Sequence, residues 1–231
     1  MDTAIVDENG TLYYYENGKG TEKGLIKIGD AYYYAGPNGK LVVDQKYYAW
    51  KVENCDMPAA HYLFDKDGKL VGASADGEIV DINGVLYFYR SGKPAEMGLF
   101  ELDGNYYVAQ YDGKIITGKY YVWKAQEGLE DLNNAWRYLD ADGKLLQGIC
   151  EHPEKGGLYY FVNGQVKEMG LFLNDDGFYY VAQAGGKILT SENYNTYGEP
   201  GKYYVWKIDE SANNIEKGWY FFDATGKMII E

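Results

Sequence analysis

Residues 120–124 read Tyr120-Tyr121-Val122-Trp123-Lys124, and almost the same pentad occurs at 47–51 (YYAWK) and at 203–207 (YYVWK). A run of one leucine and three aromatic residues precedes each pentad, at 12–15, 86–89 and 158–161. The sequence therefore repeats itself with a period of about 73 residues. Such a period is typical of repeat proteins, in which each unit buries its apolar surface against its neighbour. We predict one continuous array of stacked repeats.

The repeats divide the chain of 231 residues into three copies, which we place at 1–81, 82–155 and 156–231. The third copy is longer, because the stretch between Gly186-Lys187 and the following pentad exceeds the corresponding stretches of the other copies. We therefore predict an additional loop from Ser191 to Lys202 in the third copy alone.

Short tyrosine-rich runs bounded by Asn-Gly or Asp-Gly are strong hairpin signals, and they recur throughout the chain. Examples are the stretch from Tyr13 to Lys19 and the dipeptides Asn163-Gly164 and Asp142-Gly143, whose glycines we expect at positive φ. No segment keeps a helical apolar period for more than about two turns. We predict an all-β fold, a repetitive β-hairpin solenoid-like array, with loops at 125–134 and 209–215 that could each hold a single turn.

The charge balance limits the partners. The chain has 22 lysines and arginines against 35 acidic residues, a formal net charge of −13. A negative field repels phosphates and anionic lipids, so we expect neither nucleic acid binding nor membrane insertion. No apolar run is long enough to span a bilayer, and Met1 is not followed by a secretory signal. We expect the chain to be part of a larger multidomain protein.

Residues for catalysis or metal binding do not form a recognisable pattern. His61 and His152, the two histidines, lie in unrelated repeat contexts, so a nucleophilic triad is not indicated. Spacing does not exclude a pair of carboxylates for glycoside hydrolysis, but most acidic residues lie in turns, where they are accounted for structurally. Cys55 and Cys150 occupy non-equivalent positions; we expect free thiols and leave a disulfide open. We predict no enzymatic activity, no cofactor and no metal.

The aromatic residues are the candidate binding groups. Tyrosine occurs 26 times, and each pentad places its second tyrosine two residues before a tryptophan, on the same face of a strand. Such rings stack on the apolar face of a sugar, and nearby lysines can bond its hydroxyls. The tryptophans could equally be core staples between units. The candidate site residues are Tyr48, Trp50, Tyr121, Trp123, Tyr204 and Trp206, with Lys124 and Lys207 beside them and Trp136 and Trp219 as flanking walls.

One pattern covers almost the whole chain and is clearest in the second copy. The string Leu102-Asp103-Gly104-Asn105-Tyr106-Tyr107 is followed by Asp112-Gly113-Lys114-Ile115-Ile116-Thr117-Gly118. This arrangement resembles the choline-binding and glucan-binding cell-wall repeat superfamily. The resemblance implies a β-hairpin solenoid on an exported, cell-surface protein of a Gram-positive bacterium. It also implies that aromatic residues bind choline on teichoic acids or α-glucan chains, without catalysis.

The chain departs from that pattern where choline repeats begin with Gly-Trp. The matching steps here are Gly24-Leu25, Gly98-Leu99 and Gly170-Leu171, and only Gly218-Trp219 keeps the dipeptide. A cation cage would lose a wall. We therefore predict a non-catalytic module that binds a polysaccharide, an α-glucan of the starch or dextran kind, by aromatic stacking. The alternatives are a choline or teichoic-acid anchoring module and a structural spacer or protein-interaction solenoid.

Overall fold

The computed structural model describes residues 3–52, 55–95 and 98–230. The chain forms two compact units, each of which is described by itself. The first contains Met1–Leu102 and Val108–Ile115; the second contains Asp103–Tyr107 and Ile116–Glu231. The three copies were defined by sequence period, which is a different criterion, and their boundaries remain predictions.

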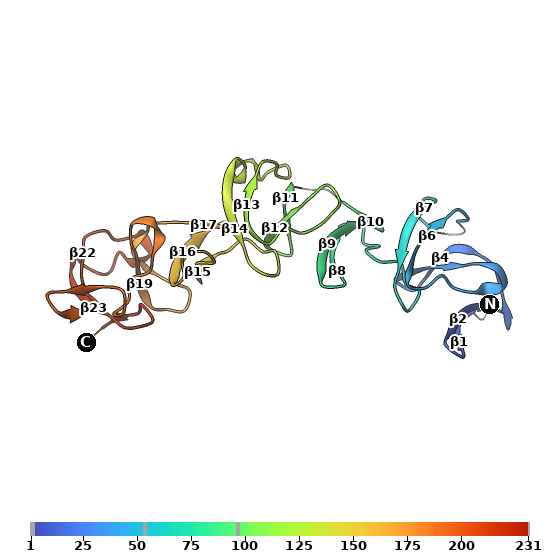
Figure 1. Ribbon diagram of the computed structural model, residues 1–231, viewed down its shortest axis with the longest axis horizontal. Helices are drawn as coiled ribbons and strands as arrows, with labels where there is room; N and C mark the ends of the chain where they lie inside the picture. Colours follow the sequence, from blue (N-terminus) through green and yellow to red (C-terminus); the bar gives the residue numbers. More distant parts are fainter. Residues whose placement is uncertain (1–2, 53–54, 96–97, 231) are drawn as a thin grey trace. The chain divides into compact units, whose positions relative to one another are not determined.

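The first unit consists of antiparallel hairpins that follow one another along the chain (Figure 1). Its strands are β1 (Thr3–Glu8), β2 (Thr11–Glu16) and β3 (Lys19–Gly20) in one sheet, β4 (Gly24–Ile28) with β5 (Ala31–Ala35), β6 (Gln45–Ala49) with β7 (Ala60–Phe64), and β8 (Glu78–Ile82), β9 (Val85–Arg90) and β10 (Lys93–Pro94) in another sheet. A 3₁₀ turn, η1 (Pro37–Gly39), follows β5. The boundary between the units falls in the hairpin of β11 (Gly98–Leu102) and β12 (Asn105–Ala109).

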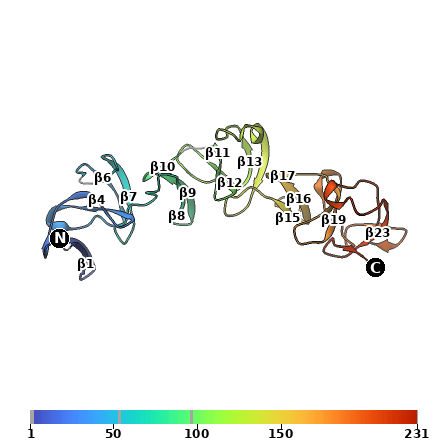
Figure 2. The same cartoon turned by 180° about the vertical axis from the view of Figure 1, so that it is seen from behind.

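The second unit has the same kind of architecture, seen from behind in Figure 2. Its strands are β13 (Gly118–Val122) with β14 (Ala135–Leu139), β15 (Gly148–Glu151), β16 (Leu158–Val162) and β17 (Gln165–Val166) in one sheet, β18 (Gly170–Leu173) with β19 (Tyr179–Ala182), β20 (Asn195–Thr196) with β21 (Glu199–Pro200), and β22 (Lys202–Val205), β23 (Gly218–Phe222) and β24 (Met228–Ile229) in another sheet. Its 3₁₀ turns are η2 (Glu130–Leu132), η3 (Ala184–Gly186) and η4 (Glu210–Ala212). The predicted all-β hairpin array is confirmed.

Two kinds of tight turn close these hairpins. Asn163 and Gly164 both have positive φ, 49° and 73°, which fits a primed turn. At Asp142-Gly143 only the glycine has positive φ, 80°. Here the carboxylate of Asp140 accepts hydrogen bonds from the N–H groups of Asp142 and Lys144, at 2.9 and 2.8 Å. The expected positive φ of the glycines is confirmed, but the aspartate side chain makes this second turn a different type.

A short motif, Gly-Lys followed by an apolar residue, ties a hairpin to the one before it at five places in the described chain. The apolar side chain is buried, and its backbone N–H donates to a carbonyl of the preceding hairpin. These bonds run from Leu41 to Leu12, Leu70 to Tyr32, Ile115 to Leu86, Leu145 to Tyr106 and Ile188 to Leu158, all at 2.8 or 2.9 Å. Pairing of neighbours is the physical basis of stability in a repeat array.

The Gly-Leu steps form the centre of the core. Leu25 and Leu171 are fully buried. The N–H of Leu171 donates to the carbonyl of Lys207 at 2.9 Å, and that of Leu25 donates to Lys51 at 2.8 Å. A Cβ on Gly170 would lie 2.5 Å from the same Lys207 oxygen, so only glycine allows this approach. The leucine at this step is therefore a core residue that closes the copy behind its pentad.

The remaining local predictions have clear outcomes. The loop predicted at 191–202 is present and contains its own small hairpin, β20–β21. Both stretches predicted as loops contain a single 3₁₀ turn, η2 and η4, so the single-turn alternative describes them better. Cys55 and Cys150 are free thiols. Among the described residues, no helix has the length and apolar character needed to cross a membrane.

Candidate functional site

The second tyrosine of each pentad stands on the first strand of a closing hairpin, opposite a residue of the second strand. The registered pairs are Tyr48 with His61, Tyr121 with Trp136 and Tyr204 with Trp219. Their ring centroids lie 4.9, 5.5 and 5.4 Å apart. In the second and third copies the rings are almost perpendicular, at 71° and 70°. Each of these two hairpins presents an aromatic corner made of an indole and a phenol.

The pentad tryptophans do not make the pairs that the sequence predicted. Strand β22 ends at Val205, so the alternation that would place Trp206 beside Tyr204 stops one residue too early. The indole Nε1 of Trp206 instead donates to the hydroxyl of Tyr203 at 3.0 Å. The second copy repeats this bond, from Trp123 to Tyr120 at 3.1 Å. Among the described residues, the ring partner of Tyr204 is Trp219, not Trp206.

All of the predicted aromatic residues are exposed. Their exposed fractions lie between 40% and 59%, for Tyr48, Trp50, Tyr121, Trp123, Trp136, Tyr204, Trp206 and Trp219. This excludes the alternative in which the tryptophans are core staples. That role belongs to buried leucines, phenylalanines and tyrosines, such as Leu171 and Phe222 in the third copy. Exposure of eight large aromatic rings to water is energetically unfavourable, and a ligand that covers the rings removes part of that exposed apolar surface.

A lysine that the sequence analysis missed lies beside each aromatic corner. The ammonium of Lys119 lies 5.7 Å from the ring centroid of Trp136, and that of Lys202 lies 5.8 Å from Trp219. Both distances fit cation–π contacts. The strand period could have found these lysines, because each stands two residues before the exposed tyrosine and so shares its face.

The lysines that the sequence analysis did propose are placed differently. Lys207 forms an ion pair with Glu168 at 3.0 Å, and the equivalent Lys51 lies 3.7 Å from Glu22. Lys207 does not line the hollow described below. Lys124 is exposed at the equivalent position of the second copy. A direct role of Lys124 and Lys207 in binding stays a prediction.

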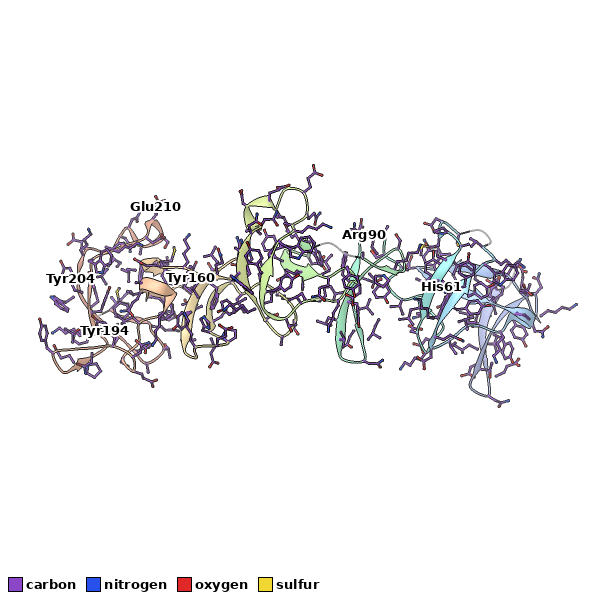
Figure 3. All side chains as sticks on the ribbon, turned by 45° about the horizontal axis from the view of Figure 1, so that its top comes forward. His61, Arg90, Tyr160, Tyr194, Tyr204 and Glu210 are labelled. Atoms are coloured by element: carbon purple, nitrogen blue, oxygen red, sulfur yellow. The ribbon has the colours of Figure 1, made fainter. Side chains whose placement is uncertain are left out.

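The third copy adds a concave surface to its aromatic corner. A hollow of about 600 Å³ is lined by Tyr203, Tyr204, Trp206, Trp219, Tyr194, Thr196, Gln183 and Ala184. Tyr194 and Thr196 come from the additional loop of this copy, and Figure 3 labels Tyr194 and Tyr204. The structure thus brings three predicted residues together and adds two from an insertion whose position, but not role, the sequence revealed.

The hydroxyl of Tyr203 connects the parts of this hollow. Its ring meets that of Tyr194 edge to face, with centroids 5.2 Å apart, and its oxygen accepts the indole bond of Trp206. Burial raises the pKa of Tyr203 above 10.0, although the bond from Trp206 opposes the shift. The phenol therefore keeps its proton at neutral pH and can donate it to an acceptor in the hollow. The hollow offers apolar ring surface with a few neutral polar groups.

Comparison with known proteins gives the following relationships. No family model matches the chain. It is 26% identical over 163 residues to glucosyltransferase-S of Streptococcus mutans, a match that covers 68% of this chain. The chain spans only about a tenth of the length of that relative.

Solved structures with a related fold include choline binding protein F of Streptococcus pneumoniae, which is 18% identical with a TM-score of 0.32; the match covers 98% of this chain and 93% of that one. An alternansucrase in complex with isomaltononaose is 21% identical with a TM-score of 0.41; the match covers 98% of this chain and 18% of the enzyme. The resemblance to choline-binding and glucan-binding repeat proteins that the sequence predicted is confirmed by these similarities.

Proposed function

We propose that the chain is a non-catalytic carbohydrate-binding module that binds an α-glucan by aromatic stacking. The observation that carries this proposal is the hollow of the third copy, where the exposed corner of Tyr204 and Trp219 is enclosed by Trp206 and by Tyr194 of the additional loop. The second copy offers the same corner with Tyr121 and Trp136. The proposed ligand contacts both corners as separate weak sites on one polymer.

The chemistry of the hollow suits a neutral sugar. An indole face covers the axial C–H groups of a pyranose, while the hydroxyl of Tyr203 and the side chains of Gln183 and Thr196 supply hydrogen-bonding groups for sugar hydroxyls. Its volume of about 600 Å³ lies within the usual range for small-molecule sites. An open hollow rather than a closed cavity suits a polymer whose ends extend beyond the site. Repetition along the polymer then adds avidity.

The aromatic corners are poor sites for choline. A quaternary ammonium needs a ring face free of other cations, but the ammonium of Lys202 already lies 5.8 Å from the centroid of Trp219. Lys119 occupies the corresponding place over Trp136. The Gly-Leu steps provide no substitute wall, because Leu25, Leu99 and Leu171 are fully buried. These features favour a neutral sugar over a cationic ligand.

The similarity to a glucosyltransferase supports a glucan as the ligand that we propose. Because the chain corresponds to about a tenth of the glucosyltransferase, we propose that it serves a larger, secreted or cell-surface protein of a Gram-positive bacterium. In that role it would hold a starch-like or dextran-like polymer, or a related cell-wall polymer, near the rest of the protein.

The test is tryptophan fluorescence during titration with maltoheptaose, isomaltooligosaccharide and choline at matched ionic strength. All five tryptophans are exposed, so stacking on any of them changes the emission. A saturable change with one of the two sugars is expected, and Trp219→Ala should weaken it without abolishing it, because the corner of the second copy remains. A matched control is Trp50→Ala, which removes an equally exposed indole outside the third copy and leaves that change in place.

Two outcomes would contradict the proposal. A saturable response to choline alone assigns the module to choline or teichoic-acid anchoring. No response to any of the three ligands favours a structural spacer or a protein-interaction solenoid.

A further inference from the structure

A pocket with a different character lies between the closing hairpin of the first copy, β6–β7, and residues 89–94 near the start of the second copy. This pocket has a volume of about 480 Å³ and is lined by Lys46, His61, Tyr89, Lys93, Ala60, Leu63, Gly92 and Pro94. Three of these side chains are basic and none is acidic. The pocket lies wholly within the first unit, where Figure 3 labels His61.

Three equivalent lysines show why this pocket stands apart. Lys46, Lys119 and Lys202 occupy the same position of their hairpins, one residue before the tyrosine pair. Glu154 neutralises Lys119 at 3.2 Å, and Glu199 neutralises Lys202. Within the described parts of the chain, Lys46 has no such counter-ion. Two copies therefore balance this charge internally and the first copy does not.

The aromatic surroundings differ in the same direction. Lys119 lies over the rings of Trp136 and Tyr138, with centroids 5.7 and 5.4 Å away. In the first copy, Leu63 stands opposite Lys46, and His61 replaces the tryptophan. Among the residues that the structure describes, Lys46 thus has neither a carboxylate nor an indole face to offset its charge.

A second lysine completes the pocket. Lys93 belongs to the short strand β10, and no ion pair of its side chain is found among residues 3–52, 55–95 and 98–230. The turn before it is tightly held: a Cβ on Gly92 would lie 2.7 Å from Leu70 and from Tyr62, and the Gly92 N–H donates to Gly72 at 2.6 Å. Close packing therefore fixes β10 against β7 and keeps Lys93 beside His61 and Lys46.

We propose that this pocket binds the phosphate group of a sugar phosphate. Two lysine ammonium groups supply point charges and only hydrogen-bond donors, which suits a tetrahedral oxyanion. A pocket of about 480 Å³ exceeds the volume of an inorganic phosphate and leaves room for a sugar ring. The exposed ring of Tyr48, whose centroid lies 4.9 Å from that of His61, offers that sugar a stacking surface. The inference concerns a different pocket from the proposed glucan site and does not depend on it.

The histidines provide a direct readout. The chain has two, and His152 is buried in the second unit with an exposed fraction of 1%, so it serves as an internal control. The probe is glucose 6-phosphate. Its binding is followed through the ring proton signals of both histidines in NMR spectra at constant pH and ionic strength. A saturable shift of the His61 signals alone is expected, with a much weaker response to glucose or to inorganic phosphate. His61→Gln assigns the signals.

Substitution of the lysines tests the source of the affinity. Lys93→Gln and Lys46→Gln should each weaken glucose 6-phosphate binding by about tenfold or more, because each removes a charge-assisted bond. The matched control is Lys202→Gln, which removes the equivalent lysine where Glu199 already neutralises it, and binding should be unchanged. Lys46 and Lys93 are exposed and Lys202 is half-buried, and thermal unfolding curves verify that the variants are folded.

The proposal would be overturned by any of three results: His61 signals that do not move, a Lys202→Gln variant as weak as Lys46→Gln, or glucuronate binding as tightly as glucose 6-phosphate. The last result would assign the pocket to carboxylates rather than phosphates. None of these results affects the titration with neutral sugars. The glucan-binding proposal and the sugar-phosphate proposal are therefore tested independently.

Discussion

In the first copy Tyr48 faces His61 across β6–β7, whereas in the third copy Tyr204 faces Trp219 across β22–β23. The two hairpins share strand register and the buried Gly-Leu step behind them. They differ in the residue opposite the tyrosine, in the residue opposite the lysine, which is Leu63 in one and Phe221 in the other, in the carboxylate that pairs with that lysine, and in an additional loop. The comparison shows that the repeat separates residues that hold the fold from residues that meet a ligand. Changes in the second group alter the pocket chemistry while the backbone pairing stays the same.

The largest effect should come from the shared part. Leu171→Ala and Leu25→Ala each remove a fully buried side chain from a core cluster and should each lower the free energy of unfolding by about 2–5 kcal/mol. Urea unfolding measures the loss. Trp206→Ala is the comparison, because it removes an exposed side chain and should cost about 1 kcal/mol or less. Equal losses of unfolding free energy in Trp206→Ala and Leu171→Ala would mean that the exposed aromatic residues also stabilise the fold.

The next effect concerns the aromatic corner. Trp219→His gives the third copy the residue of the first and removes the indole face from the hollow. We expect the affinity for the preferred oligosaccharide to fall by about tenfold, equivalent to about 1.4 kcal/mol. Isothermal titration calorimetry measures it. His61→Trp is the reciprocal variant, and it should leave oligosaccharide binding in the third copy as it was. An unchanged affinity in Trp219→His would rule out the corner as the site.

A smaller effect should come from the additional loop. Tyr194→Ala removes the edge-to-face contact with Tyr203 and one wall of the hollow. Such a contact is worth about 0.5–1.5 kcal/mol, so we expect a loss of affinity of about threefold to tenfold. Tyr197→Ala is the control, since Tyr197 lies in the same loop, is 90% exposed and does not line the hollow. If both variants bind alike, the loop is not part of the site.

The smallest effect concerns the charge pair of the second copy. Hydrogen bonds from Tyr138 and Lys119 hold the pKa of Glu154 below its usual value of 4.5. Because the folded-state pKa is lowered, the stabilisation is complete above pH 4.5 and is lost as the pH falls through the folded-state value. Glu154→Gln should therefore lower Tm slightly at pH 7, and the difference from the unsubstituted chain should vanish at acidic pH. A difference that grows on acidification would contradict this pairing.

Much of the fold could be predicted because its signals are local. Tight turns need glycine at positive φ, as at Gly143 and Gly164, and the period of the pattern implies stacking. The sequence alone did not reveal the role of the glycine in the Gly-Leu step or the role of the Gly-Lys motif. Both depend on contacts with a distant carbonyl, such as Lys207 for Gly170, which no local pattern reveals.

The candidate site was predicted less well, for reasons of geometry. The choice of tryptophans was sound in that they are exposed, but Trp206 follows the end of its strand and so leaves the face of Tyr204. Lys202 obeys the strand period and could have been found. Tyr194 could not, because only the folded path of the additional loop brings it to Tyr203.

The contact between Gly170 and Lys207 closes entirely within the third copy, as that between Gly24 and Lys51 does within the first. The first and third copies thus each fix the Gly-Leu step by a backbone contact that begins and ends inside the copy. The copies are joined by backbone pairing, because β8 at the end of the first copy pairs with β9 of the second, and β15 of the second pairs with β16 of the third. A duplication that keeps the register of these shared sheets would add a further set of exposed aromatic residues without altering the contacts inside the other copies. Evolution can therefore adjust the number of ligand contacts, and hence the avidity, by counting copies rather than by redesigning a core.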